Sequence, residues 1–257
     1  MIRRTFVILP SIGNGTERSL WRDGIRHWDE FIDSPSINGM SQSRKEKMDE
    51  HLIEAREMLN SGHSHYFTNL LVPCEQWRLF QEMEPSVTYL DIETDGLRHD
   101  SKVTVVGIHR DGETRTLVRG IDLHSDSLAR ALRGTKLLVT FNGRSFDVPL
   151  LDFNFPFTVP RVPHFDLRHG CARIGLRGGL KKVERDVGIG RPKEVDYVTG
   201  EEAAYLWKLW ERKGNQNALN LLRRYNEEDT RNLEPLARHT YERLKSRLEG
   251  EMIECQR

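Results

Sequence analysis

Residues 87–96 read VTYLDIETDG, and this stretch decides the fold because an apolar strand runs directly into acidic side chains. Side chains two positions apart on a strand share one face, so Asp91 and Glu93 point the same way. Carboxylates on a buried face need cations or hydrogen bonds. The alternative is a strand that ends at solvent with both acids hydrated. We expect one of these two environments for Asp91 and Glu93.

The segments that follow this strand predict an α/β domain with a mixed sheet. Further strands are expected at Lys102–His109, Thr114–Val118, Lys136–Phe141 and Arg161–Leu167, with a helix at Ser125–Arg133. The chain then turns helical, at Leu180–Val187, at Glu201–Arg212 and from about residue 217 to 248. A strand hairpin, then a β-α-β unit, then helices is the order expected of a mixed sheet flanked by helices.

The composition changes near residue 85, which predicts a small helical region at residues 1–84 and the α/β domain at residues 85–250. Residues 7–32 look like a helix-hairpin-helix, whose turn holds a DNA phosphate through backbone N–H groups. Ser11 stands where the first glycine of such hairpins usually stands. The alternative is a packing module with Trp21, Ile25 and Trp28 as its core. Residues 33–84 would connect this module to the α/β domain, with Trp77 and Phe80 packing against it.

Bulk composition limits the class of protein. The formal net charge is zero, so the overall charge does not indicate a polyanionic partner, although basic residues can still gather on one face. Cys74, Cys171 and Cys255 are odd in number and far apart, which argues against a disulfide framework or a zinc ribbon. No apolar run approaches membrane-spanning length. We expect a cytoplasmic protein without a membrane partner, and the oligomeric state stays open.

A second acidic position lies in residues 138–151, which read LVTFNGRSFDVPLL. A strand ends at the turn Asn142-Gly143, and a helix is expected to start near Ser145 with Pro149 in or near its first turn. Asp147 therefore lies at a helix start among apolar neighbours. For an isolated aspartate, the simpler interpretation is an acid favoured there by the helix dipole.

A third segment, residues 221–233, reads LLRRYNEEDTRNL and is helical in pattern. Residues four apart share a helix face, so Tyr225 and Asp229 point the same way. Neighbouring leucines border that face, which predicts that Asp229 points inward while Glu227 and Arg231 point outward. Taken alone, a Tyr/Asp pair of this kind is more often a structural hydrogen bond than a catalytic pair.

The order of these three segments resembles the exonuclease motifs of the DEDD superfamily, which has a ribonuclease-H-like fold. Motifs I, II and III are matched by Asp91-x-Glu93, Asn142-Gly143-x-x-Phe146-Asp147 and Tyr225-x-x-x-Asp229. Residues 179–188 resemble the leucine-centred helix between motifs II and III, and the resemblance covers roughly residues 85 to 245. The tyrosine in motif III is typical of the DEDDy subgroup. The chain is most similar to the YprB-type ribonuclease-H-like family.

The resemblance implies a metal-dependent nuclease whose site holds two Mg²⁺ or Mn²⁺ ions. Asp91 would bridge both ions, Glu93 and Asp229 would complete the first site, and Asp147 would hold the second ion. Tyr225 would orient the attacking water. Four carboxylates in one pocket would repel, at roughly 4 kcal/mol per pair about 4 Å apart in an effective dielectric near 20. Hard oxygen ligands suit magnesium or manganese better than zinc.

The expected partner is nucleic acid, DNA or RNA, bound at a single-stranded end. Asn142, Lys181 and Lys182 are candidate contacts to the substrate backbone, against the commoner roles of turn residue and solvated helix lysines. The favoured activity is 3′-5′ exonucleolytic hydrolysis. The alternatives are a structure-specific endonuclease on the same fold and a nucleic-acid-binding module that has lost catalysis. The presence of all four carboxylates disfavours the last of these.

Overall fold

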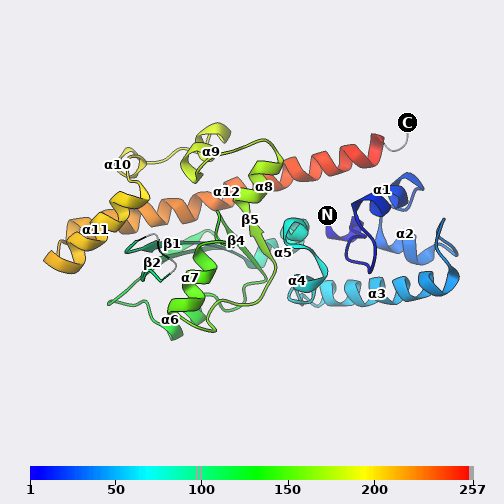
Figure 1. Cartoon of the computed structure of the whole chain (residues 1–257), viewed down its shortest axis with the longest axis horizontal. Coiled ribbons are helices and arrows are strands. Elements are labelled where there is room, and N and C mark those ends of the chain that lie inside the picture. Colours follow the sequence, from blue (N-terminus) through cyan, green and yellow to red (C-terminus); the bar gives the residue numbers. More distant parts are fainter. Residues whose placement is uncertain (97, 99, 255–257) are drawn as a thin grey trace.

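The computed structural model describes residues 1–96, 98 and 100–254, and its centre is a sheet with the strand order β3-β2-β1-β4-β5 (Figure 1). The strands are β1 (Val87–Thr94), β2 (Val103–Arg110), β3 (Glu113–Val118), β4 (Leu137–Thr140) and β5 (His164–Asp166). The β1–β2 and β2–β3 pairs are antiparallel, whereas β1–β4 and β4–β5 are parallel. The predicted mixed sheet is therefore confirmed.

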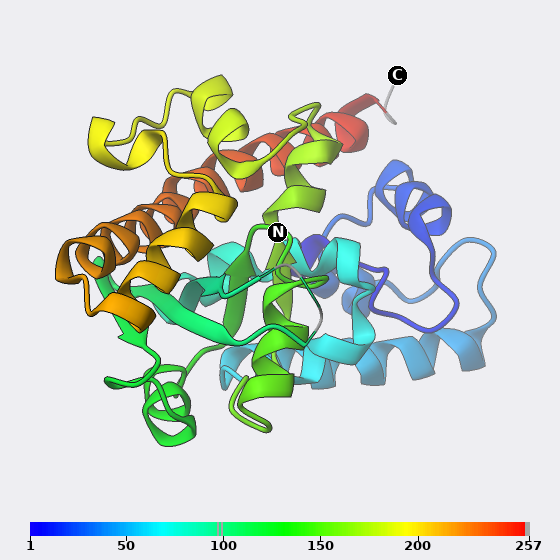
Figure 2. The same cartoon turned by 60° about the vertical axis from the view of Figure 1, so that its left-hand side comes forward.

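Helices cover both faces of this sheet (Figures 1 and 2). They are α6 (Ser125–Ala131), α7 (Asp147–Asn154), α8 (Leu167–Arg173), α9 (Leu180–Val187), α10 (Lys193–Asp196), α11 (Gly200–Lys213) and α12 (Gln216–Glu254). On one face, Leu90 and Ile92 of β1 pack with residues of α6 and α7. On the other face, Tyr89 shares a cluster with residues of α12. Within the described residues, the helices are too short or too polar to span a membrane.

The end of the sheet differs from the sequence-based expectation. The strand predicted at Arg161–Leu167 is limited to β5, because Pro160 and Pro163 have no N–H for a ladder and Leu167 already begins α8. Asp166 caps that helix by accepting a hydrogen bond from the backbone N–H of Arg168 at 3.1 Å. The short helix α8 was not predicted, and it places its side chains beside the carboxyl end of β5.

The region predicted to be helical, residues 1–84, consists of helices joined by short loops, and its last helical element extends to Ser86. The elements are η1 (Ile2–Arg4), α1 (Asn14–Arg22), α2 (Trp28–Asp33), α3 (Gln42–Asn60), α4 (Tyr66–Leu70), η2 (Pro73–Leu79), α5 (Phe80–Met83) and η3 (Glu84–Ser86). Residues 7–32 contain α1 and α2, and the element before the turn at Ser11 is the three-residue 3-10 helix η1. Trp21 and Trp28 are fully buried, which is the packing expected of a small core.

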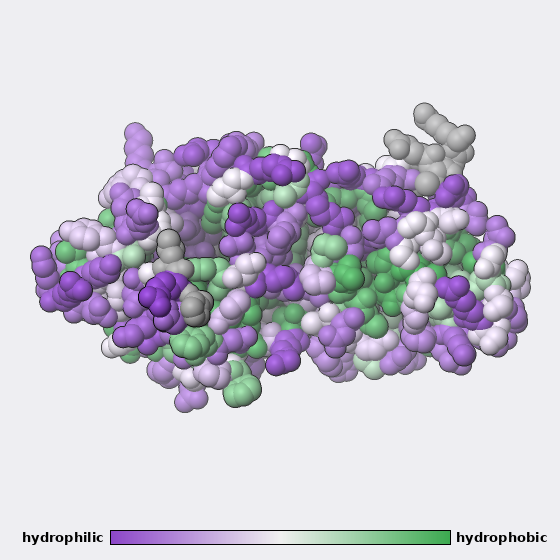
Figure 3. Space-filling view, in the orientation of Figure 1, coloured by the Kyte–Doolittle hydropathy of each residue, from purple (hydrophilic) through white to green (hydrophobic). Residues whose placement is uncertain are grey.

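This N-terminal region shares one hydrophobic cluster with the second half of α12. Trp77 lies 5.9 Å from Tyr241 between ring centroids, and Phe80 lies 5.4 Å from the same ring, so both aromatic residues pack against the α/β region as expected. Figure 3 shows hydrophobic residues gathered over the N-terminal region, in the space bordered by α2 and α3. Because one cluster crosses residue 85, the division into two domains at that point stays a prediction.

Candidate metal centre

Strand β1 carries Asp91 and Glu93 to the sheet face that α12 covers. Asp91 pairs with Gly107 of β2, and the Nδ2 of Asn226 in α12 donates to Asp91 Oδ2 at 2.9 Å. Glu93 is only 7% exposed. The interpretation as a solvated strand end is therefore wrong for Glu93, and the pair lies in an environment that has to compensate buried charge.

Gly107 explains how α12 comes so close to these acids. A Cβ atom at this position would lie 2.0 Å from the Thr230 hydroxyl oxygen and 2.5 Å from the Asn226 amide oxygen, so only glycine allows the helix to pack here. The approach brings Tyr225 and Asp229 against β1. Both are buried, at 8% and 7% exposure, which confirms the predicted inward face of this helix.

Asp147 reaches the site from the turn after β4. Asn142 adopts a left-handed backbone with φ 71°, and a Cβ on Gly143 would lie 2.4 Å from the hydroxyl oxygen of Thr140. This tight turn ends at α7, whose first residue is Asp147, two positions later than the predicted helix start. The Asp147 side chain is 5% exposed, so it is more than a surface acid at a helix N-terminus.

The three segments meet in one cavity of about 170 Å³. The predicted residues that line it are Asp91, Glu93, Asn142, Asp147, Tyr225 and Asp229. One carboxylate oxygen each from Asp91, Glu93 and Asp229 lies within 4.8 Å of the others. Asp147 lines the same cavity but is not a member of that closest group. The structure thus assembles acids that are up to 138 positions apart, from Asp91 to Asp229.

Mutual repulsion and burial make the ionised state of these acids unfavourable. Burial, followed by the charges of Asp229 and Glu93, raises the pKa of Asp91 well above its ordinary value. Burial, then Asp229 and Asp147, does the same to the pKa of Glu93. Burial raises the pKa of Asp147 to about 7. Burial also raises the pKa of Asp229, although Arg191 opposes this shift. Perturbed acids gathered in a cavity are a common property of functional sites.

The donor set fits a hard divalent cation. Glu93 Oε1 is buried and has no hydrogen-bond partner among the described residues. An unpaired buried carboxylate oxygen is costly, and a cation among the carboxylates would remove that cost. The site offers carboxylate oxygens, which are the ligands that Mg²⁺ and Mn²⁺ prefer. Asp91, Glu93 and Asp229 are the residues closest together for such binding, and Asp147 lies beside them.

Arg191 is a member of this site that the sequence did not reveal. Its side chain is 3% exposed, and the guanidinium donates to Glu184 of α9 through Nε at 2.5 Å and Nη2 at 2.7 Å. Its Nη1 donates to Asp229 Oδ1. Burial alone would lower the pKa of Arg191, but Glu184 and Asp229 raise it, so the group stays charged. Arg191 lies between α9 and α10, where no periodic pattern marks an inward position.

Of the other predicted residues, Tyr225 lines the cavity, whereas Lys181 and Lys182 do not. Burial and the neighbouring acids raise the pKa of Tyr225, so its phenol stays protonated. The ammonium of Lys181 lies 5.1 Å from the centroid of the Tyr225 ring and donates to carbonyl oxygens of Val195, Asp196 and Val198. Lys182 is exposed and pairs with Asp186 at 2.6 Å. Both lysines thus have partners within the protein, and their contact with nucleic acid stays a prediction.

Comparison with known proteins places this geometry in a family. The model of the RNase_H superfamily matches residues 88–241. The fold is similar to a family B DNA polymerase from the hyperthermophilic archaeon Pyrobaculum calidifontis, at TM-score 0.46 and 18% identity over 60% of this chain. The chain spans only 24% of that polymerase. A structure described as the apo form of a nuclease is matched at TM-score 0.48 and 18% identity, over 72% of this chain and 84% of the other. No curated protein matches.

Proposed function

Because the chain belongs to the RNase H superfamily, we propose that it is a metal-dependent nuclease that hydrolyses phosphodiester bonds of DNA or RNA, acting as a 3′-5′ exonuclease. The observation that carries this proposal is the convergence of Asp91, Glu93, Asp147 and Asp229 on one cavity. Membership in the superfamily supports a nuclease. The finer assignment, to the DEDDy subgroup and the YprB-type family, rests on the order of the three motifs and on the tyrosine at position 225.

Four carboxylates would hold the cations in this proposal, with Asp91, Glu93 and Asp229 in the closest group and Asp147 beside them. Two divalent cations would neutralise the pocket, activate a water at neutral pH and stabilise the leaving oxygen of the broken phosphodiester bond. The chain itself keeps the carboxylates in place. Asn226 bonds Asp91 from α12, and Arg191 bonds Asp229 from the segment between α9 and α10.

Tyr225 is assigned to orientation of the attacking water. Its raised pKa keeps the phenol protonated, so the phenolate is not available as a base at neutral pH. The useful contribution of Tyr225 is therefore a donated O–H hydrogen bond. The ammonium of Lys181 lies 5.1 Å from the centroid of the Tyr225 ring, and this contact limits the positions that the ring can take. A protonated phenol among carboxylates can order a water without taking its proton.

The test uses single-stranded DNA and RNA labelled at either end, incubated with the full chain in Mg²⁺, Mn²⁺ or EDTA. We expect stepwise shortening from the 3′ end that stops in EDTA. Asp229→Asn should abolish this activity because it removes a carboxylate charge at nearly constant shape. Glu227→Gln is the matched control, since it changes a neighbouring acid of α12 that does not line the cavity.

Each other outcome redirects the proposal in a defined way. Internal cuts with the same dependence on metal and on Asp229 would keep the site and replace the exonuclease by an endonuclease. Shortening from the 5′ end would overturn the polarity. If no substrate is cut while strands still bind equally to wild type and Asp229→Asn, the protein is a binding module and the catalytic proposal fails.

A further inference from the structure

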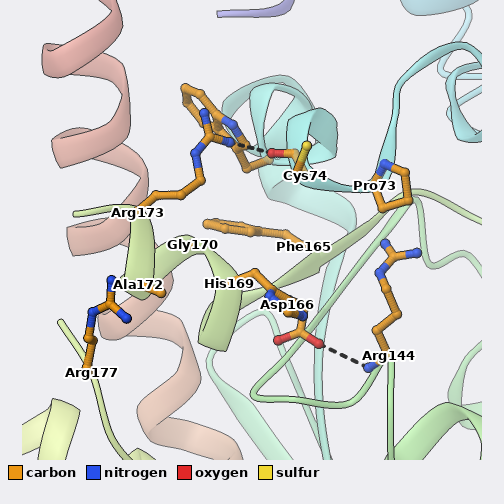
Figure 4. Close-up of a pocket in the computed structure, with 11 residues that line it drawn as sticks. Pro73, Cys74, Arg144, Phe165, Asp166, His169, Gly170, Ala172, Arg173 and Arg177 are labelled. Atoms are coloured by element: carbon orange, nitrogen blue, oxygen red, sulfur yellow. Dashed lines mark hydrogen bonds between the residues drawn. The ribbon is translucent and has the colours of Figure 1, made fainter. Parts of the chain in front are cut away.

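A second, larger cavity of about 510 Å³ lies between η2, β5 and α8 (Figure 4). Its volume is in the range of sites that bind small organic ligands or single nucleotide units, about 300–1,000 Å³. Pro73 and Ala172 contribute apolar surface, and Phe165 of β5 lies at the cavity centre in Figure 4, where it is 2% exposed. None of the proposed cation ligands lines this cavity.

The charged groups around this cavity favour an anion. Arg144, Arg173 and Arg177 line it, together with His169. Asp166 is the one carboxylate that lines the cavity among the described residues, and it already accepts hydrogen bonds from the backbone N–H groups of Asn142, Arg144 and Arg168, at 2.8, 3.1 and 3.1 Å. Its oxygens are therefore occupied by the protein. Three arginines line the cavity against the charge of Asp166, and Arg173 is paired with Glu75, so the lining keeps a net positive charge.

Two of the arginines differ in how they are held. Arg173 donates to the carbonyl oxygen of Cys74 at 2.5 Å, pairs with Glu75 at 3.2 Å and lies 5.9 Å from the Trp77 ring centroid. It is thus fixed before any ligand arrives. Arg177 is exposed and makes no hydrogen bond or ion pair with the residues that the structure describes. A fixed guanidinium in the wall and a free one at the rim suit a ligand that carries phosphate.

Gly170 shapes the cavity. A Cβ atom there would lie 2.7 Å from the ring of Phe165 and 3.1 Å from Thr240, so glycine lets α8 approach both β5 and α12. This approach places His169 and Arg173 of α8 beside Phe165 of β5 (Figure 4).

One loop connects this cavity with the carboxylate cavity. Asn142 lines the carboxylate cavity, and two residues later Arg144 lines the second cavity. The backbone N–H groups of both residues bind the two oxygens of Asp166, so the loop is fixed to the end of β5. A flexible polyanion that occupies the carboxylate cavity can therefore continue around this loop into the positive one.

We propose that this second cavity binds one nucleotide unit of a single nucleic-acid strand whose phosphodiester backbone lies at the carboxylate cavity. The base packs against the apolar surface, and the phosphate lies between Arg173 and Arg177. Phosphate contacts are a usual source of affinity for single strands, and contact of the base with the apolar lining removes its apolar surface from water. The proposal rests on the proposed nuclease function and names its substrate class as an unpaired strand.

The first experiment separates the cavity from the reaction centre. Steady-state cleavage of a labelled single strand and of a nitrophenyl ester of a nucleoside monophosphate is compared in wild type and in the double variant His169→Ala/Arg177→Ala. We expect KM for the strand to rise about tenfold with kcat within twofold, and cleavage of the ester to stay unchanged. Arg115→Ala is the matched control, because Arg115 is exposed on β3 at the opposite edge of the sheet. Equal KM values for the double variant and this control would overturn the proposal.

The second experiment measures occupancy of the cavity without catalysis, through the reactivity of the exposed Cys74 thiol. Alkylation of Cys74 by a maleimide is followed in the Cys255→Ser chain in EDTA, where Cys171 is buried and burial raises the pKa of its thiol. A single strand should slow alkylation at least fivefold, and this protection should disappear in the double variant. A nucleoside monophosphate should protect only at much higher concentration.

This readout also separates failure of the two proposals. Protection by a strand in a chain that cuts nothing would leave the binding site in place and remove the nuclease function. A lack of protection by any strand, with cleavage intact, would remove the binding site alone. Protection by the monophosphate but not by the strand would assign the cavity to a free nucleotide. Equal protection by polyglutamate would show that the cavity binds polyanions in general. Either result would overturn the proposal.

Discussion

Two groups of buried acids in this molecule differ in how far protein atoms compensate their charge. In the N-terminal region, Glu17 accepts hydrogen bonds from the Phe6 backbone N–H at 2.6 Å and from Arg78 at 2.9 Å. Arg78 also bonds Glu75 at 2.6 Å, and all three side chains are at most 4% exposed. In the carboxylate cavity, Glu93 has an oxygen without any partner among the described residues. Burial raises the pKa of Glu17 and of Glu93, but only Glu17 has protein partners for its buried charge that leave no oxygen unpaired; in the carboxylate cavity Asp91 and Asp229 have partners, whereas Glu93 keeps an unpaired oxygen.

The difference shows how a structural charge is told from a functional one. A buried acid whose partners are all protein atoms stabilises one arrangement of the chain, and losing a partner is costly. A buried acid that lacks partners destabilises the chain until something from outside binds. The first group is therefore expected to control folding, and the second is expected to control binding and reaction. The following predictions test this separation, from the largest expected effect to the smallest.

The largest effect is expected from Asp91→Asn. We expect the rate of cleavage to fall about ten-thousandfold, on the order of 5 kcal/mol of transition-state stabilisation, because the central carboxylate of the site loses its charge. Thermal stability in EDTA should stay equal or increase, since one repelling charge has been removed. Cleavage assays and melting curves of the same preparation check both halves. A variant that is inactive because it melts far below wild type would contradict the separation.

The next effect is expected from Arg78→Met. This change leaves Glu17 and Glu75 buried without their main partner, so we expect a loss of about 3–5 kcal/mol in the free energy of unfolding. Chemical denaturation measures it. Arg22→Met is the matched control, because Arg22 is exposed on α1. The concentration of Mg²⁺ at half-maximal rate should not change. A change in metal dependence without loss of stability would show that the two groups of acids are not separate.

The pH dependence of stability gives a smaller effect with a defined sign. The pKa values of Asp91, Glu93, Asp147 and Asp229 are raised in the folded protein, so the folded state without metal binds protons more tightly than the unfolded chain. The associated stability is present below the ordinary carboxyl pKa of about 4. It is lost as the pH rises through the folded values, about 7 for Asp147.

The melting temperature in EDTA should therefore fall by several degrees between pH 5 and pH 8 through this group of acids. Mn²⁺ should raise it more at pH 8 than at pH 5, because the cation competes with protons for the same carboxylates. Differential scanning calorimetry at both pH values, with and without Mn²⁺, measures the two shifts. Equal stabilisation by Mn²⁺ at both pH values would contradict this assignment, and Asp91→Asn should weaken the dependence.

The smallest effect is expected from Arg191→Lys. Lysine keeps the charge but cannot bond both oxygens of Glu184 and reach Asp229 at once, because it lacks the planar fork of arginine. We expect the Mn²⁺ concentration at half-maximal rate to rise about tenfold, with kcat in saturating Mn²⁺ within threefold of wild type. Arg185→Lys on the exposed side of α9 is the control. A fall in kcat with unchanged metal dependence would show that Arg191 acts on the substrate instead of on Asp229.

Most of the residues that line the carboxylate cavity could be predicted, because their spacing follows the regular periods of strands and helices. Strand alternation placed Asp91 and Glu93 on one face, and the four-residue spacing of a helix placed Tyr225 with Asp229. Asp147 needed the resemblance to known motifs, because a helix-start aspartate has an ordinary explanation of its own. In each of these cases local geometry carried the information.

The parts that could not be predicted depend on distant partners or on irregular chain. Arg191 lies between two short helices, and its partner Asp229 is 38 positions away, so no local pattern marks it. Helix α8 has seven residues and starts at the residue after β5. Its first residue therefore belongs to a stretch whose sequence pattern is typical of a strand. The larger cavity combines residues of η2 with β5 and α8, and neither the composition nor any motif brings positions 73 and 177 together.

Helix α12 runs without a break for 39 residues, and this continuity has a consequence for how the chain acquires its structure. Its first half supplies Tyr225 and Asp229, while its second half closes the cluster of the N-terminal region, where Arg4 pairs with Glu249 across 245 positions. During synthesis, the N-terminal region is made before α12, with which it shares this cluster. The apolar residues of the N-terminal region therefore stay partly exposed until α12 packs against them. Contacts between residues so far apart in the sequence form slowly. The N-terminal region and the reaction centre should consequently become ordered together, late, as one cooperative event.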